Sequence, residues 1–335
     1  MAPARAAKTA RRRATRPGGP WLSPPGAITC AAKYPTPMEK EAIADWFRGL
    51  QDRICADLEV CDGQGTFKED AWDRPGGGGG RARVLADGEQ IEKGGVNFSA
   101  VYGNTPEPIK QQLGTDGDEF FATGVSIVMH PRSPRVPIIH MNVRYFEMSN
   151  GVHWFGGGID LTPHYIVRDQ AQWFHRQLKA VCDKHHPEYY PEFKRWADDY
   201  FYIRHREETR GVGGIFFDRL QPTDSITKED RWAFVQGVGN VFAPIYTRLV
   251  NQNREVPFGE RELDWQRLRR GRYVEFNLVW DSGTKFGLET NGRTESILMS
   301  LPPQADWAYN HQPEPGSAEA ATLAGLKKGI NWIDA

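Results

Sequence analysis

Polar side chains that could bind anions and move protons alternate along one short stretch of the chain. Between Ile139 and Tyr145, the residues His140, Asn142 and Arg144 alternate with apolar or aromatic residues. Because alternate residues of a strand point to the same face, a strand here would place these three side chains together. Arginine binds carboxylates through paired hydrogen bonds, and histidine exchanges protons near neutral pH. The pattern predicts one wall of a site for an acidic substrate.

A second stretch, from Gly124 to His130, predicts a similar face. Ser126 and His130 lie an even number of residues apart, so a strand would point both to one side. An ordinary solvated sheet face is the alternative for both stretches. Solvated faces favour Thr, Lys and Glu, whereas these carry Ser, His, Asn and Arg, which favours the pocket wall.

Three consecutive glycines precede an aspartate in the next apolar segment, Trp154–Pro163. Glycine inside a strand lets another group approach the backbone closely, and a flat ligand would fit there. Asp160 lies two residues after the last of these glycines and could accept hydrogen bonds from N–H groups of such a ligand. A bulge or tight bend with Asp160 as a cap explains the same residues equally well.

Several histidines are spread along the middle of the chain. Divalent metals bind clustered histidines, but these four lack the HExxH type of spacing. Each is more readily explained as a packed or solvated side chain, so spacing alone gives a metal site little support. The four candidates are His130, His140, His175 and His205.

Two later segments complete the set of candidate residues. The residues from Gly271 to Trp280 alternate polar and apolar, which predicts a strand with Tyr273, Glu275 and Asn277 on one face. Residues 290–296 are typical of a turn that enters a helix. Arg293 in that turn could bind a carboxylate with the help of backbone N–H groups, or form an ordinary surface ion pair.

These residues need a sheet and helices to position them. Strands cluster in the middle of the chain and helices follow, without regular alternation or repeats, which predicts an α+β fold around one large antiparallel sheet in a single domain. The predicted strands are Val96–Tyr102, Thr123–Met129, Pro137–Glu147, Val152–Leu161, Gly211–Phe217 and Arg272–Trp280. The predicted helices are 39–60, Asp169–Lys184, Pro191–Glu208, Lys228–Val250 and 317–330. The glycine run Gly76–Gly80 lacks the Lys-Ser/Thr of a phosphate-binding loop and is interpreted as a mobile loop, such as a lid beside a ligand.

Composition limits the classes of protein that fit. The 335 residues carry a formal net charge of −1, which argues against bulk attraction to nucleic acid or anionic membranes. The four cysteines form no CxxC pair, so they indicate free thiols in a reducing compartment. No apolar run approaches the ~20 residues of a transmembrane helix.

The first 38 residues differ from the remainder. They contain no Asp or Glu but several Arg and Lys residues, and they lack the apolar region of a secretory signal. This composition is typical of an organellar transit peptide, with a disordered basic tail as the alternative. The stretch from Ile28 to Ala31 resembles a chloroplast cleavage pattern, so a chloroplast is expected before a mitochondrion, and the cytosol last.

Long blocks of the chain then identify it as similar to one family. The blocks are GGGGGRARVL, GGVNFSAVYG, GVSIVMHP, HMNVRYFEM, WFGGGIDLTP, DDYFYIRHREETRGVGGIFFD and GRYVEFNLVWDSGTKFGLETNGRTESILMSLPP. In this order they resemble the oxygen-dependent coproporphyrinogen III oxidases, over nearly all of residues 39–335. The resemblance implies a large flat antiparallel sheet flanked by helices on both sides, and a homodimer. It also implies oxidative decarboxylation of two propionates of coproporphyrinogen III to vinyl groups, which yields protoporphyrinogen IX for haem and chlorophyll.

Roles for single residues follow from the same resemblance. It places the proton donor on His140, the acidic residue that faces the pyrrole nitrogens on Asp160, and a propionate-orienting cation on Arg144. The implied substrate contacts are Ser126, Asn142, Val143, Arg144, Asn291, Gly292 and Arg293. Many members have Gly-Gly-Arg where this chain has Asn291, although Asn tolerates left-handed backbone conformations well. The dimer-forming region corresponds to Tyr273–Trp307.

Cofactor needs are also implied only by resemblance. Molecular oxygen is the co-substrate, and no organic cofactor is expected. Some bacterial members are described with a divalent metal at the four histidine positions, and others are considered metal-free. Two alternatives stay open at this point: a metal-dependent oxygenase that uses those histidines, and a tetrapyrrole carrier that binds the porphyrinogen without releasing carbon dioxide.

Overall fold

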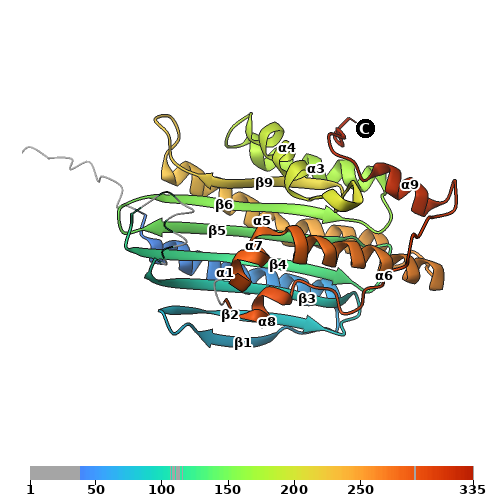
Figure 1. The fold of residues 1–335 in the computed structure, drawn as a ribbon, viewed down its shortest axis with the longest axis horizontal. Coiled ribbons are helices and arrows are strands. Elements are labelled where there is room, and N and C mark those ends of the chain that lie inside the picture. The colour runs from blue at the N-terminus through green and yellow to red at the C-terminus, as the bar shows by residue number, and fades with distance from the viewer. Residues whose placement is uncertain are drawn as a thin grey trace, which may run out of the picture. The chain divides into compact units, whose positions relative to one another are not determined.

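An antiparallel sheet of seven strands runs through the centre of the structure, a computed structural model (Figure 1). The model describes residues 38–334 except 106, 108–109, 111–113, 115 and 290–291. Across the sheet, the strands are β1 (Lys68–Asp73), β2 (Gly78–Ala86), β3 (Ile91–Asn104), β4 (Glu119–Pro131), β5 (Ile138–Met148), β6 (His153–Thr162) and β9 (Gly213–Leu220). The first six are consecutive in the chain, so each hydrogen-bonds to its sequence neighbour. The predicted α+β class is confirmed.

One face of the sheet, here called the core face, carries the alternating apolar residues and is covered by three long helices. These helices are α1 (Lys40–Asp62), α3 (Arg168–Asp183) and α5 (Lys228–Asn253). The predicted apolar stripe of α1 is confirmed, because its members recur every three or four residues and are at most 2% exposed: Ile43, Phe47, Leu50, Ile54 and Leu58. Each such side chain stabilises the fold by about 1.5–3 kcal/mol, so the core face anchors the sheet.

The opposite face, here called the site face, is covered by the later part of the chain. In Figure 1, α6 (Glu260–Glu275), α7 (Ser282–Glu289) and α8 (Thr294–Leu298) lie in front of the sheet, and α1 and α5 lie behind it. Hydrogen bonds to backbone carbonyls attach this cover to the strands. Nζ of Lys93 donates to the carbonyl of Leu301 at 2.7 Å, and Nδ2 of Asn97 donates to that of Ser296 at 2.7 Å. The site face is therefore closed by a segment distant in sequence.

The prediction of a strand from Arg272 to Trp280 is wrong. Helix α6 runs through Glu275 and continues as a π-helix over Phe276–Trp280. Nδ2 of Asn277 donates to the carbonyl of Tyr273, one helical turn earlier, at 2.9 Å. A short apolar run fits the period of a strand and that of a helix equally well. Here the polar residues that alternate with the apolar ones bond to partners within and around a helix. Tyr273, Glu275 and Asn277 are therefore helical residues and do not share a strand face.

The helix predicted from Pro191 to Glu208 is too long. Helix α4 spans Tyr189–Tyr200, and a hairpin of two short strands follows, β7 (Tyr202–Ile203) and β8 (Glu208–Thr209). Between them lies a 3₁₀ turn, Arg204–Arg206, which Glu207 ends with a φ of 55° in the left-handed region. His205 thus belongs to a turn and does not extend the apolar row of α4.

The glycine run Gly76–Gly80 is part of the sheet, which contradicts its interpretation as a loop. Gly77 has a φ of 116° in the turn after β1, and β2 begins at Gly78. A Cβ on Gly79 would lie 2.2 Å from the carbonyl oxygen of Trp72, so glycine is required for this close pairing of β1 and β2. The run therefore shapes a hairpin at the edge of the sheet.

The end of the chain packs beside the sheet. The predicted last helix is shorter than expected and spans Ala318–Gly325 as α9. Its Glu319 accepts hydrogen bonds from Tyr165 at 2.8 Å and from Arg261 at 2.8 Å. Among the helices of the described residues, none has the length and apolar character needed to cross a membrane.

Candidate active site

The predicted polar face of two neighbouring strands is present on the site face. In β5, His140, Asn142 and Arg144 alternate with fully buried apolar residues of the core face. The strand register places Ser126 of β4 directly opposite Asn142, and Asp160 of β6 directly opposite His140. Side chains of directly paired residues point to the same face, so residues from three strands meet in one patch.

His140 and Asp160 form the centre of this patch. Nδ1 of His140 lies 2.9 Å from Oδ1 of Asp160. The side chain of Asp160 is only 1% exposed, whereas that of His140 is 21% exposed. A carboxylate can only accept, so Nδ1 carries the hydrogen in this contact, and Nε2 is left to exchange protons.

The carboxyl of Asp160 has a second partner that the sequence did not reveal. Nη2 of Arg210 donates to Oδ1 at 2.6 Å, and Nε donates to Oδ2 at 3.2 Å. Burial alone would raise the pKa of Asp160, but the charge of Arg210 and the contact with His140 outweigh burial and lower it. Asp160 is therefore held ionised, with its oxygens directed at protein groups.

The contacts of Asp160 bear on its predicted role. Its side chain is 1% exposed, and both of its oxygens bond protein groups. One of these groups is Nδ1 of His140, and a carboxylate partner commonly orients the ring of a histidine. The contact of Asp160 with pyrrole nitrogens stays a prediction.

Arg144 lies flat against the sheet beside this pair. Nη1 donates to Oδ1 of Asn142 at 2.8 Å, and Nη2 donates to Oδ1 of Asp218 at 2.7 Å. A Cβ on Gly156 would lie 2.8 Å from Cζ of Arg144 and 2.6 Å from Oδ1 of Asp218. The glycine run does permit a close approach, as predicted, but the flat group at Gly156 is the chain's own guanidinium.

The remaining predicted substrate residues are placed differently from one another. The side chain of Val143 is fully buried on the core face, which leaves only its backbone for the predicted substrate contact. Arg293 precedes α8, where Nη2 bonds Asp70 of β1 and Nη1 donates to Oγ of Ser296 at 3.4 Å. Gly292 lies beside Arg293, and Asn291 lies outside the described residues.

The four histidines proposed for a metal do not form one site. His175 is fully buried, with Nδ1 at 2.9 Å from the hydroxyl of Tyr190 and Nε2 at 2.9 Å from the carbonyl of Val212. Nε2 of His130 lies 2.8 Å from the carbonyl of Ser300. Within the described residues, no group of three or more His, Cys, Asp or Glu side chains could hold a metal ion. The donor set does not fit a resident metal.

His205 belongs to a separate surface cluster. Nε2 lies 2.8 Å from Oε2 of Glu275, and Nδ1 accepts from the indole of Trp280 at 2.9 Å. Arg206 donates twice to the same carboxylate, at 2.9 and 2.7 Å. Burial opposes ionisation of Glu275, but Arg206 and His205 outweigh it and lower the pKa to about 2. This cluster fixes the junction between the β7–β8 hairpin and the end of α6.

Two residues of the site, Arg210 and Asp218, were missed from the sequence. Asp218 shares a face of β9 with Gly214 and Phe216. The predicted strand ended one residue earlier, at Phe217, and alternation along a strand longer by one residue would have identified Asp218. Arg210 follows β8 outside any periodic element, next to other arginines of the stretch Arg204–Arg210. Only the folded structure shows that Arg210, and not another arginine of this stretch, bonds Asp160.

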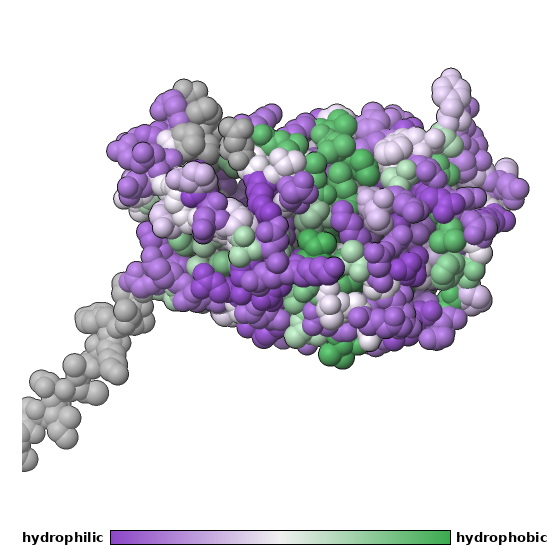
Figure 2. All heavy atoms as spheres, turned by 90° about the horizontal axis from the view of Figure 1, so that it is seen from below, coloured by the Kyte–Doolittle hydropathy of each residue, from purple (hydrophilic) through white to green (hydrophobic). Residues whose placement is uncertain are grey.

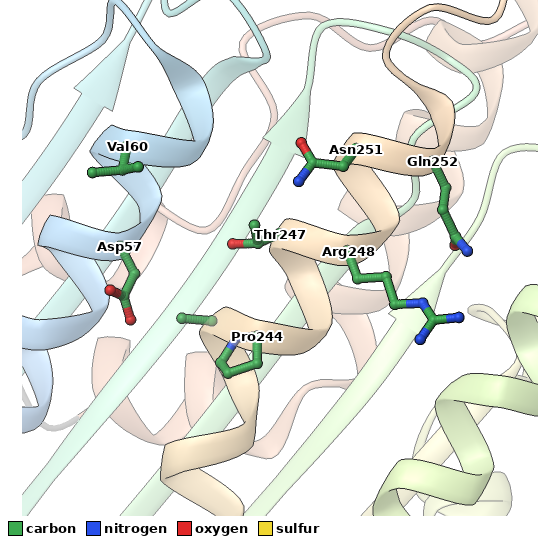
Figure 3. A pocket seen from close by; sticks show the side chains of 8 residues that line it. Asp57, Val60, Pro244, Thr247, Arg248, Asn251 and Gln252 are labelled. Carbon is green, nitrogen blue, oxygen red and sulfur yellow. The ribbon is translucent and has the colours of Figure 1, made fainter.

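One pocket lies away from this patch. It has a volume of about 650 Å³ and lies between α1 and α5, where Figure 3 shows Asp57 and Val60 facing Thr247 and Asn251. Its lining includes none of the residues of the polar patch on the site face.

Together, these groups define a class of protein: an α+β enzyme whose sheet carries an arginine and a histidine with a buried carboxylate partner on one face. Aromatic side chains border the patch, with the rings of Tyr200 and Phe216 stacked at 4.0 Å. Such a surface suits an acidic substrate with an apolar body.

Comparison with known proteins narrows this class to one family. A family model described as coproporphyrinogen III oxidase matches residues 42–332. The oxygen-dependent coproporphyrinogen-III oxidase of Synechococcus sp. (strain CC9605) is 46% identical over 332 residues, which is 92% of this chain and 91% of the relative. The enzyme of the same name from Synechococcus sp. (strain CC9902) is 50% identical over 309 residues, 85% of each chain. The chain belongs to the coproporphyrinogen III oxidase family.

Proposed function

We propose that this chain is an oxidoreductase that converts coproporphyrinogen III to protoporphyrinogen IX with molecular oxygen, in the synthesis of haem and chlorophyll. The observation that carries the proposal is the placement of Arg144 and His140, both partly exposed, on the same face of β5 in a member of this family. The substrate brings four carboxylates on a flexible apolar macrocycle, and these need a fixed cation and an apolar surround.

In the proposed reaction, each propionate loses carbon dioxide and two electrons. The ring-attached carbon of the side chain gives up a hydrogen with its electron pair to oxygen. The bond to the carboxylate carbon then breaks, and its electrons form the vinyl double bond as carbon dioxide leaves. The reduced oxygen takes one proton and becomes hydrogen peroxide.

The side chains of the site supply position and protons for this reaction. Arg144 holds a propionate through its guanidinium, while Asn142 and Asp218 keep that guanidinium flat on the sheet. Nε2 of His140 delivers the proton to the reduced oxygen, and Asp160 holds the imidazole through Nδ1. Ser126 and the turn with Gly292 and Arg293 complete the proposed substrate contacts. The second propionate must afterwards reach the same place.

The experiment that tests the function measures turnover of coproporphyrinogen III by the full chain, with and without oxygen and with and without a chelator. Fluorescence of the oxidised product reports formation of vinyl groups. We expect product only with oxygen and no loss of rate with the chelator, because the histidines do not form a metal site. Product that disappears with chelator and returns with a divalent ion would contradict the metal-free mechanism. Tight binding without any product would instead indicate a carrier.

The proposal includes a homodimer formed through the region Tyr273–Trp307. Several large hydrophobic side chains of this region are 41–55% exposed: Leu278, Val279, Phe286, Leu288 and Trp307. Figure 2 shows hydrophobic side chains gathered in the middle of one face. Apolar clusters of this kind commonly mark an interface between proteins.

Substitution of Val279 by aspartate is expected to dissociate the dimer. Val279 is 45% exposed on the π-helix, and a carboxylate without a partner is costly in an apolar interface. We expect the dissociation constant to rise at least about 100-fold, measured by analytical ultracentrifugation. Val60→Asp is the matched control, because Val60 is 83% exposed on α1, outside this region. A Val279→Asp protein that stays dimeric would contradict the proposed interface.

The proposed cellular location is the chloroplast. The support is the acid-free, arginine-rich composition of residues 1–38 and the similarity of the remaining chain to enzymes of Synechococcus strains. The mitochondrion and the cytosol follow in that order.

A further inference from the structure

Arg210 is a buried cation in the middle of the molecule. It is 3% exposed and lies between β8 and β9, where its backbone N–H donates to the carbonyl of Phe201 at 2.8 Å. Its guanidinium donates to both oxygens of Asp160, at 2.6 and 3.2 Å. A buried guanidinium is costly unless its charge is compensated, so the pair with Asp160 needs strong local support.

Three aromatic rings provide that support. The guanidinium carbon lies 4.4 Å from the ring centre of Phe201, 4.6 Å from that of Phe276 and 4.7 Å from that of Tyr273. Cations over aromatic faces are stabilised most where water is excluded. Because the rings come from the end of α4, from α6 and from the π-helix, the cage fixes Arg210 against the sheet from several elements.

The position of Arg210 affects His140 through one shared atom. Oδ1 of Asp160 accepts from Nη2 of Arg210 and also contacts Nδ1 of His140. An ionised Asp160 keeps the hydrogen of a neutral imidazole on Nδ1, and the cation beside it offsets part of the attraction that the carboxylate exerts on a second proton. The contact therefore bears on the orientation of the imidazole and on which of its nitrogens carries the hydrogen.

We propose that Arg210 is a positioning residue for proton transfer, which acts through Asp160 to fix the orientation and the tautomer of His140. This inference rests on the proposed function, in which His140 supplies a proton. The other charged or titratable groups around Arg210 are Tyr200 on α4, Tyr273 on α6 and Asp281 beyond the π-helix. Among the described residues, none of these three donates a hydrogen bond to Asp160, so Arg210 is the principal cation acting on it.

Arg210→Met tests the inference through the pH dependence of turnover. Removal of the cation lets the Asp160–His140 pair hold a proton more tightly. The ionisation limb of kcat, which is the part of the pH profile where kcat changes as this pair loses its proton, is therefore expected to move up by about one pH unit. We expect kcat to fall about 10- to 100-fold because the imidazole loses its fixed orientation, while KM changes less than about twofold. Arg210→Lys retains the charge without the paired hydrogen bonds, so its limb is expected to stay near that of the wild type while kcat still falls.

A second measurement needs no turnover and no substitution of Arg210. In ¹⁵N-histidine-labelled wild-type protein, with the His140 signals assigned by comparison with His140→Asn, neutral His140 is expected to be the Nδ1–H tautomer. Observation of the Nε2–H tautomer would overturn the inference even if the enzyme is active. Loss of turnover in the wild type would instead count against the proposed function and leave this measurement intact.

The control separates positioning from general structural support. Arg269 is also buried, 5% exposed, and pairs with Glu208 at 2.8 Å. Arg269→Met is expected to lower thermal stability without moving the ionisation limb. If Arg210→Met folds and its limb coincides with that of the wild type, or if Arg269→Met moves the limb equally, Arg210 is only structural.

Discussion

Replacement of His140 by asparagine is expected to lower kcat by about 10²- to 10⁴-fold, the range in which positioned acids and bases contribute. His140 combines an exposed Nε2 with an Nδ1 fixed by Asp160 at 2.9 Å. Asparagine is small enough to fit and retains an N–H for Asp160, but it cannot transfer a proton at neutral pH. The measurement is steady-state kinetics with coproporphyrinogen III under saturating oxygen.

The control for this substitution is His311→Asn, since His311 is exposed and lies beside Trp265, far along the chain from the patch. We expect its kcat to match that of the wild type. The thermal stability of His140→Asn should stay close to that of the wild type, because the side chain is already partly exposed. A folded His140→Asn enzyme with more than a tenth of the wild-type kcat would remove His140 from the mechanism.

Replacement of Arg144 by glutamine is expected to act mainly on substrate binding. A hydrogen bond to a charged partner contributes about 1.5–3 kcal/mol, which corresponds to a rise in KM of about 10- to 100-fold. Arg144→Lys keeps the charge but loses the planar fork that Asn142 and Asp218 hold against Gly156, so we expect an intermediate KM. Steady-state kinetics over a range of substrate concentrations gives both values.

Arg176→Gln serves as the comparison for Arg144, because Arg176 is exposed on α3, whose helix covers the other side of the sheet. Its KM should be unchanged. Should Arg144→Gln retain the KM of the wild type, the propionate must be held by another cation, and Arg293 before α8 is the next candidate.

The sequence revealed those parts of the site that depend on strand alternation alone. His140, Asn142 and Arg144 share a face because β5 is a regular strand, and its apolar alternate residues are fully buried on the core face. The core helix α1 was also predictable, since its apolar spacing is regular from Ile43 to Leu58, over about four turns. Local periodicity is sufficient to predict which residues share a face wherever a single strand or helix contributes all of them.

Contacts between distant elements could not be predicted in this way. The pairing of His140 with Asp160 depends on the register of β5 and β6, which the turn between them sets. Arg210 reaches Asp160 from a segment without periodicity, and the strand expected at Arg272–Trp280 is a helix because its polar residues bond within the helix and to the β7–β8 hairpin. Glycines raised a similar ambiguity, because Gly156 admits a side chain of the same protein where a ligand was expected.

The route of the chain through the fold also bears on how the enzyme forms. Strands β1 to β6 pair with their neighbours in sequence, so the meander can zip up through short loop closures, which are fast. The cover of the site face is different, because Asn97 bonds Ser296 across 199 residues and Lys93 bonds Leu301 across 208 residues. Arg210, Tyr273 and Phe276 come together only when that cover docks. Catalytic competence is therefore acquired at the end of folding, and during synthesis only after the ribosome has released nearly the whole chain.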